Sequence, residues 1–237
     1  MTGDGIDLWQ FALDGGTGAV TAALEVLDPG ERAQFRQYAN SRLAAAFAIR
    51  RAARRIILAR YLGAGPSEVP IRDAAAGKPG LPGPPDLHFN ASHSANLGIL
   101  AVASRIPVGA DVERLRPIDA KALGARILSP SERLEFETTE PDALEAGIFW
   151  AWTGKEALVK GIGVGLDLRD LPLISLPVAP AQAVWRVAEF GGRMQVHGRW
   201  QVYSLAPSAG YVISLAAPAE AAVTVIDARS LLAAHGI

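Results

Sequence analysis

Two carboxylates stand one residue apart at the end of an apolar run, in the segment IPVGADVERLR over 106–116. In an extended strand, residues i and i+2 lie on the same face, so Asp111 and Glu113 are predicted to share one face while Val108 and Val112 enter a core. Like charges this close raise the pKa of a carboxyl group and cost stability unless a cation lies between them. The pair therefore predicts a cationic partner, and a divalent metal would suit it.

The segment FWAWTGKEALVKG over 149–161 predicts a helix with a charged face. Trp152, Glu156 and Lys160 recur four residues apart, and Lys155 is expected on the neighbouring edge of the same face. Such a helix would present an aromatic ring, a carboxylate and two ammonium groups together. The alternative is a surface Glu-to-Lys pair beside a tryptophan in the core, which the same spacing commonly produces.

A third polar group lies in FNASHS over 89–94, where Asn90, Ser92, His93 and Ser94 supply several donors suited to phosphate oxygens. These residues do not predict a serine hydrolase, because adjacent residues of an extended chain point apart and no GxSxG motif is present. The four histidines of the chain also lack the spacing of a zinc site.

The composition excludes several classes of protein. The chain has 237 residues and a net charge of −1, so it has no global electrostatic footprint for nucleic acid or an anionic membrane. No cysteine is present, which excludes disulfides, thiolate zinc sites and cysteine nucleophiles. The start MTGDGIDLWQFALDGG does not resemble a signal peptide, and no apolar run approaches the roughly 18 residues of a spanning helix. A soluble cytoplasmic protein is the expectation.

Apolar periodicity, caps and turn residues indicate a mixed α and β chain. Gly63 is the expected stop of the first helix, and the proline-rich segment 77–86 is expected to be a loop. The predicted elements are a helix over 31–62, strands over 87–103 and 106–112, helices over 129–136 and 143–161, and then antiparallel strands before a short terminal helix.

Two stretches resemble each other, DPGERAQF over 28–35 and SPSERLEF over 129–136. Both have a cap residue, a proline at the first helical position and a glutamate at the third, which is the pattern of a capping box. They are either two ordinary helix starts or the marks of a duplicated α+β lobe. In the second case the natural site is a cleft between the lobes.

FNASHS, GADVER and WTGKEALVKG occur in this order, with a basic helix and GKP upstream, and together they resemble the two-lobed, Sfp-type 4′-phosphopantetheinyl transferases. The resemblance extends from about Leu27 to Ala217. It implies an α+β fold of two similar lobes related by a pseudo-twofold axis, each with an antiparallel sheet and packed helices, and an active site in the cleft between them. The lobes are expected over 1–115 and 116–237.

The resemblance also implies an activity. Members of this family move the 4′-phosphopantetheine arm of coenzyme A onto a serine of an apo acyl, peptidyl or aryl carrier protein and release adenosine 3′,5′-bisphosphate, with Mg²⁺ required. Two-lobed members usually act as monomers. No nucleic acid or membrane partner is implied.

Carried over by motif, the family pattern assigns an expected role to nine residues. The metal ligands are expected to be Asp111, Glu113 and Glu156, the phosphate and leaving-group contact Lys160, the other phosphate contacts Ser92 and His93, and the nucleotide-side contacts Lys78, Arg51 and Arg42.

Some assignments stay open at this point. The base that takes the serine proton is either Glu156 or Glu113, acting directly or through a metal-bound water, with Glu132 as an outside candidate. Arg50 is adjacent to Arg51 and could replace it. Gly154 either permits a close approach or only weakens its helix.

Three other functions compete with the transferase. A coenzyme A-binding or carrier-binding protein without catalysis would lack charged site positions, yet all are present here. A Mg²⁺-dependent nucleotide phosphohydrolase would need no carrier protein. A nucleic-acid-binding module on the arginine-rich helix would need a basic domain with exposed aromatic residues, which the net charge and the 7% aromatic content disfavour.

Overall fold

The computed structural model describes residues 5–73, 79–82, 87–163, 169–176, 183–192, 196–205 and 210–237. Its α-helices are α1 (Thr17–Val26), α2 (Pro29–Phe35), α3 (Ser41–Leu62), α4 (Ala120–Ile127), α5 (Pro130–Glu137), α6 (Pro141–Ile162) and α7 (Arg229–Ala233). Its strands are β1 (Ile6–Ala12), β2 (Arg72–Asp73), β3 (Pro79–Gly80), β4 (Leu87–Ser94), β5 (Leu97–Ser104), β6 (Gly109–Arg114), β7 (Ile174–Ser175), β8 (Trp185–Val187), β9 (Glu189–Phe190), β10 (Gln201–Leu205), β11 (Tyr211–Ala217) and β12 (Val223–Asp227). The predicted α+β class is confirmed.

Two four-stranded sheets form the centre of the molecule, with strand orders β12-β1-β5-β4 and β6-β11-β10-β8. All neighbouring strands in them are antiparallel except β1 and β12. One core cluster joins the inner faces of the sheets, with Leu8 and Ile99 from the first and Val112 and Ile213 from the second. The alternating apolar residues of each strand thus bury one face of each sheet against the other.

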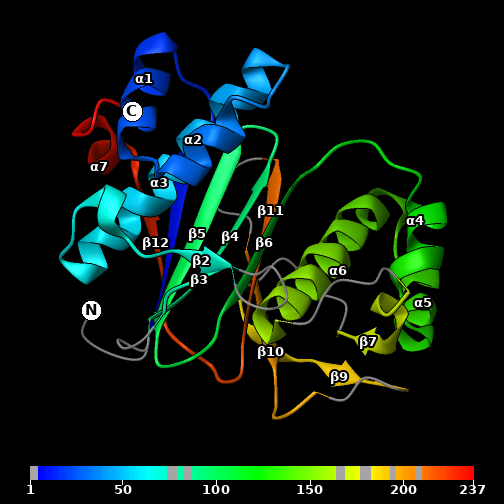
Figure 1. Cartoon of the computed structure of the whole chain (residues 1–237). Helices are drawn as coiled ribbons and strands as arrows, with labels where there is room; N and C mark the ends of the chain where they lie inside the picture. The colour runs from blue at the N-terminus through cyan, green and yellow to red at the C-terminus, as the bar shows by residue number, and fades with distance from the viewer. Residues whose placement is uncertain are drawn as a thin grey trace.

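The long helices cover the outer faces of the two sheets (Figure 1). Ile56 of α3 belongs to a core cluster with Trp9 and Phe89 of the first sheet. Leu158 of α6 belongs to another cluster with Val202 of the second sheet. The order of layers is therefore helix, sheet, sheet, helix.

Two predicted elements are each divided in the structure. The predicted helix over 31–62 is two helices, because Asn40 caps a new helix by accepting a hydrogen bond from the backbone N–H of Leu43. Its expected stop is confirmed, since Gly63 has a φ of 62° in the left-handed region.

The predicted strand over 87–103 is the hairpin of β4 and β5, which turns through Ala95 and Asn96. Ala95 has a φ of 49°, a conformation that an alanine rarely adopts, so the turn gave little signal in the sequence.

The chain order and the sheet order do not coincide. Strand β6 precedes residue 115 but lies in the second sheet, whereas β12 and α7 at the C-terminal end return to the first sheet and its helices. The division into 1–115 and 116–237, the pseudo-twofold relation and the cleft stay predictions. Elements β1, α1, β2, β3, α4 and β12 were not predicted, and β3 lies within the segment 77–86 that was expected to be a loop.

The backbones of α6 and β6 touch. A Cβ atom added to Gly109 would lie 1.9 Å from the carbonyl oxygen of Ala157 and 2.4 Å from the amide nitrogen of Gly161. Only a glycine permits this approach, which brings the last turns of α6 directly over β6. In the described part of the chain, no helix is long and apolar enough to cross a membrane.

Candidate active site

Strand β6 carries the two carboxylates of GADVER as its alternation predicts. Val108 and Val112 lie in the core between the sheets, and Asp111 and Glu113 point away from that core. Asp111 is 2% exposed, whereas the side chain of Glu113 keeps 25% of its surface. The strand therefore places one carboxylate under α6 and the other nearer to solvent.

Helix α6 supplies the cationic partner of Asp111. The Nζ atom of Lys160 lies 2.6 Å from Oδ1 of Asp111 and 3.4 Å from Oε2 of Glu156, one turn back on the same helix. Lys160 also donates to the Oγ atom of Ser92 at 3.2 Å. The predicted pairing of Glu156 and Lys160 on one helix face is confirmed.

The charges of this cluster perturb one another. Burial raises the pKa of Asp111, although Lys160 opposes it, and burial followed by the charge of Asp111 raises the pKa of Glu156. Burial alone lowers the pKa of Lys160, but Asp111 and Glu156 outweigh it and hold that pKa above its usual value. Two carboxylates with one ammonium leave an excess negative charge, which further cationic ligands would offset.

The prediction that Lys155 shares the charged face is wrong. Its side chain is fully buried, and Nζ donates to Oε2 of Glu132 at 2.5 Å and to the carbonyl oxygens of Ile127 and Leu171. Successive helix residues are about 100° apart, which turns Lys155 away from Glu156 and into the protein. Glu132 is 2% exposed and already accepts from Lys155, which disfavours it as the base.

Trp152 follows the alternative interpretation of its spacing. It packs against the core cluster beneath α6. Gly154 permits a close approach, because a Cβ atom there would lie 2.8 Å from Cδ1 of Leu176.

Strand β4 lies beside β6 and reaches it through side chains. Ser92 donates to Oδ1 of Asp111 at 2.7 Å, and Ser94 donates to Oε2 of Glu113 at 2.8 Å. Asn90 accepts from the backbone N–H of Ala110 at 2.9 Å. Three residues spaced two apart thus connect two sheets where no backbone ladder runs between these strands.

His93 points to the opposite face of β4, toward α3. Its Nδ1 atom lies 3.3 Å from Nη1 of Arg50. Burial of part of the ring, together with the charges of Arg50 and Lys160, lowers the pKa of His93 to about 4 although the side chain keeps an exposed edge. The ring is therefore neutral at neutral pH and stands beside two cations.

The structure places Arg50, and not Arg51, beside the FNASHS motif. Both arginines lie over the ring of Phe47, but Arg51 contacts Gln34 at 3.5 Å and Glu31 at 3.8 Å. Two further predicted residues are not brought to the cluster by any described contact: Arg42 is exposed in the first turn of α3, and Lys78 lies outside the described residues.

Two observations bear on a metal ion. Within the described ranges, no group of three or more His, Cys, Asp or Glu side chains lies close enough together to hold a metal. However, Oδ2 of Asp111 is buried and has no hydrogen-bond partner among the described residues. A buried carboxylate oxygen without a partner is costly, and a hard cation would satisfy it.

Sequence reasoning missed Arg116 and the contact of Ser94. Arg116 lies 3.3 Å from Oε2 of Glu113 and over the ring of Phe149. The three-residue spacing of Glu113 and Arg116 is visible in the sequence, but on a chain leaving a strand it has no fixed geometry. The contact of Ser94 needed the packing of β4 beside β6.

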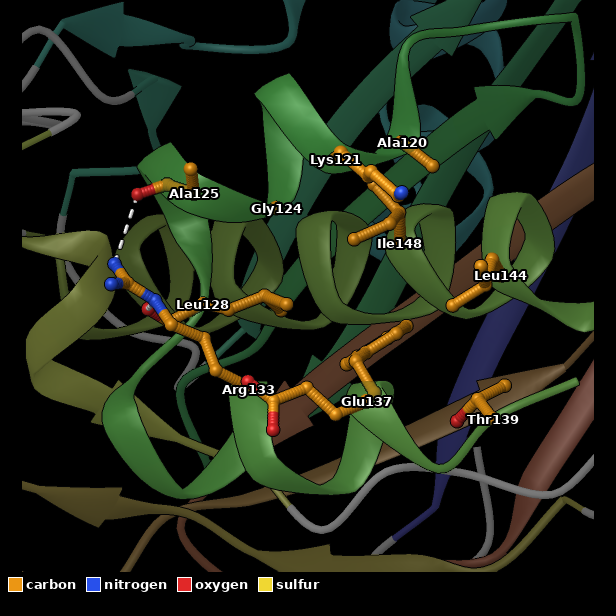
Figure 2. A pocket seen from close by; sticks show the side chains of 11 residues that line it. Ala120, Lys121, Gly124, Ala125, Leu128, Arg133, Glu137, Thr139, Leu144 and Ile148 are labelled. Atoms are coloured by element: carbon orange, nitrogen blue, oxygen red, sulfur yellow. Dashed lines mark hydrogen bonds between the residues drawn. The ribbon is translucent and has the colours of Figure 1, made fainter. Parts of the chain in front are cut away.

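A separate groove of about 480 Å³ lies between α4, α5 and α6 (Figure 2). Leu128, Phe136 and Ile148 contribute apolar walls, and Arg133 at its edge donates to the carbonyl oxygen of Ala125 at 2.9 Å. None of the predicted site residues lines it.

The fold and the charged cluster define an α+β protein in which α6 places a lysine and a glutamate against a buried aspartate of β6. A family model described as the 4′-phosphopantetheinyl transferase superfamily matches residues 107–216, which include β6 and α6.

Curated proteins show the same similarity. The 4′-phosphopantetheinyl transferase HetI of Nostoc is 30% identical over 222 residues, which cover 91% of the chain and 89% of that protein. The 4′-phosphopantetheinyl transferase Sfp of Bacillus subtilis is 32% identical over 124 residues, 52% of the chain and 53% of that protein. The 4′-phosphopantetheinyl transferase AcpT of Salmonella typhi is 35% identical over 110 residues, 46% of the chain and 56% of that protein.

The chain belongs to the 4′-phosphopantetheinyl transferase superfamily. This confirms the family predicted from FNASHS, GADVER and WTGKEALVKG, and with it the class of enzyme, a transferase.

Proposed function

We propose that this protein transfers the 4′-phosphopantetheine arm of coenzyme A to a serine of an apo carrier protein and releases adenosine 3′,5′-bisphosphate. The observation that carries the proposal is the cluster of Asp111, Glu156 and Lys160, joined from β6 and α6 in a chain of this superfamily. Ser92 of β4 completes it with bonds to Asp111 and Lys160.

The reaction sets two chemical requirements. The serine oxygen forms a bond to the phosphorus that carries the pantetheine arm, the bond from that phosphorus to the bridging oxygen breaks, and the serine proton must be accepted. Lys160 would stabilise the negative charge that collects on the leaving bisphosphate. Glu156 and Glu113 are the two proposed acceptors of the serine proton, and both lie within or beside the cluster.

Asp111, Glu113 and Glu156 would hold Mg²⁺. Their donor atoms are all carboxylate oxygens, which this ion prefers, and the buried Oδ2 of Asp111 has no described partner. Bound there, Mg²⁺ would offset negative charge on phosphate oxygens. Among the described residues these carboxylates are not grouped closely enough to hold a metal, so at least one side chain would have to move when the ion binds.

The phosphates and nucleotide of coenzyme A would meet cationic and hydroxyl groups on the β4 side. Ser92 and His93 are proposed phosphate contacts, with Arg50 or Arg51, Arg42 and Lys78 on the nucleotide side. Arg50 has the better support of the two neighbouring arginines because it stands beside His93. A cytoplasmic monomer is proposed from the family resemblance.

The test is to incubate the protein with Mg²⁺, coenzyme A and a panel of apo carrier proteins and to measure the intact mass of each carrier. A phosphopantetheine addition on the carrier serine is the expected result. Binding of coenzyme A without any addition would favour a protein that only binds. Release of the bisphosphate without a carrier would favour a phosphohydrolase. Either result would contradict the transferase.

A further inference from the structure

The polar seam between β4 and β6, defined by Asn90, Ser92 and Ser94, sets the register of the two strands. Each of these side chains bonds a different position of β6, at Ala110, Asp111 and Glu113 respectively. Because the strands belong to different sheets, these side-chain bonds connect β4 to the acidic residues of β6, whose own backbone ladder runs to β11. A side chain of the seam can thus act on the site through the acidic residues of β6.

Ser94 occupies the end of this seam with both of its hydrogen-bonding capacities used toward β6. Its hydroxyl donates to Oε2 of Glu113 at 2.8 Å and accepts from the backbone N–H of Arg114 at 3.1 Å. It is the last residue of β4 and pairs with Leu97 across the hairpin, which fixes its backbone. A hydroxyl held at both ends defines where the carboxylate of Glu113 can lie.

Glu113 is the acidic residue that most needs such a restraint. Asp111 is buried and held by Lys160, whereas Glu113 is part-exposed and lies outside that contact. Its other described partner, Arg116, has 57% of its side chain exposed and lies 3.3 Å from the same Oε2 atom. Without Ser94 the carboxylate would be free to follow Arg116 away from Asp111.

We propose that Ser94 is a positioning residue that holds Glu113 in register with Asp111 for the cation site and the transfer reaction. This proposal rests on the proposed function. A substitution of Ser94 tests the position of Glu113 more directly than a substitution of Ser92. Ser92 also contacts Lys160 and is itself a proposed phosphate contact.

The test compares Ser94→Ala with Ser94→Thr, which keeps a hydroxyl, and with the control Ser230→Ala in the exposed part of α7. Three quantities are measured: Mg²⁺ affinity by calorimetry with coenzyme A present, the rate of carrier modification against Mg²⁺ concentration, and the melting temperature. Loss of a residue that orients a metal ligand typically costs about 10- to 100-fold in affinity or activity. We expect this loss for Ser94→Ala, near-normal values for Ser94→Thr, and little change in melting temperature.

Three outcomes would overturn the proposal. Equal Mg²⁺ affinity in Ser94→Ala and Ser230→Ala would show that Ser94 does not position Glu113. A drop in melting temperature with an unchanged Mg²⁺ dependence would show a structural role only. No Mg²⁺ binding by the unmodified protein would remove the site itself. If the unmodified protein binds Mg²⁺ but modifies no carrier, the proposed function fails, while the calorimetry still tests Ser94.

Discussion

Helices α3 and α6 have the same length and the same kind of C-terminal end, yet only α6 carries the charged cluster of Asp111, Glu156 and Lys160. Each has 22 residues, each follows a short helix that begins with a capping box, and each stops at a glycine in the left-handed conformation, Gly63 or Gly163. They cover the outer faces of different sheets (Figure 1).

The capping-box glutamate of α2 and that of α5 each also form a buried ion pair with the helix that follows. Glu31 is buried and pairs with Arg54 at 2.9 Å and with Arg55 at 2.5 Å, and Glu132 is buried and pairs with Lys155 at 2.5 Å. A glutamate that caps one helix therefore also anchors the middle of the next. The same kind of ion pair occurs at α3, away from the cluster of Asp111, Glu156 and Lys160. Its role is therefore structural and not catalytic.

The two helices differ at the residue that follows the buried cation. Lys155 is followed by Glu156, which faces Lys160, whereas Arg55 is followed by Ile56, which is 2% exposed in the core of the first sheet. The same scaffold thus supports a polar face in one helix and an apolar face in the other. The role of each charged residue near such a buried ion pair must therefore be assigned separately.

Glu156→Gln should have the largest effect on activity. The amide keeps the shape of the side chain but removes the charge beside Lys160, so the rate of carrier modification should fall by about 10²- to 10⁴-fold. The rate, the affinity for coenzyme A and the melting temperature are measured beside the control Glu25→Gln on the exposed face of α1. Retained turnover would remove Glu156 from the mechanism.

Lys155→Met should have the largest effect on stability. It leaves the carboxylate of Glu132 buried without its cation, and breaking a buried ion pair in this way costs about 3–5 kcal/mol of unfolding free energy. The matched change is Arg54→Met, because Arg55 remains on Glu31 and the loss should stay within about 0.5–3 kcal/mol.

Burial and the charge of Arg51 also lower the pKa of Arg54 to about 10, so its removal relieves some repulsion. Denaturant unfolding at neutral pH gives both free energies. If the two variants lose the same free energy of unfolding, Arg55 does not compensate for the loss of Arg54. The proposed difference between the buried ion pairs of the two helices would then be wrong.

His93→Gln should have the smallest effect, visible as a change in pH dependence. Because the pKa of His93 falls from 6.5 to about 4 on folding, the unfolded chain binds more protons between these pH values. Its contribution to stability therefore rises with pH across this window and is lost as the pH falls. Melting temperatures measured from pH 4 to 7 should show a shallower slope in the variant, and an unchanged slope would contradict the lowered pKa.

The periodic elements were the most predictable part of the fold. The strand β6, the helix α6 and both capping boxes follow from local patterns that their neighbours do not override. The break between α2 and α3 was missed because Arg36 to Asn40 lack a proline or glycine to interrupt a helical pattern. Strand β12 was missed because it gains its stability from pairing with β1, more than 200 residues away in the chain.

The same limit applies to the candidate site. Spacing alone put Asp111 and Glu113 on one side of a strand, and Glu156 and Lys160 on one side of a helix. It could not choose between Arg50 and Arg51, because the two residues are of the same type and only the packing of the helix decides which one lies beside His93. It also misplaced Lys155, whose partner Glu132 is 23 residues away.

The sequence by itself determined the family, the acidic residues and the lysine, because the motifs are short segments whose residue types and periods are fixed locally. The tertiary structure decided which charges meet. The contact of α6 with β6 brings Lys160 to Asp111. Packing also buries Lys155 with Glu132 as an ion pair and places Ser94 within hydrogen-bond distance of Glu113. These contacts join residues distant in the chain, so they depend on packing and not on any local pattern.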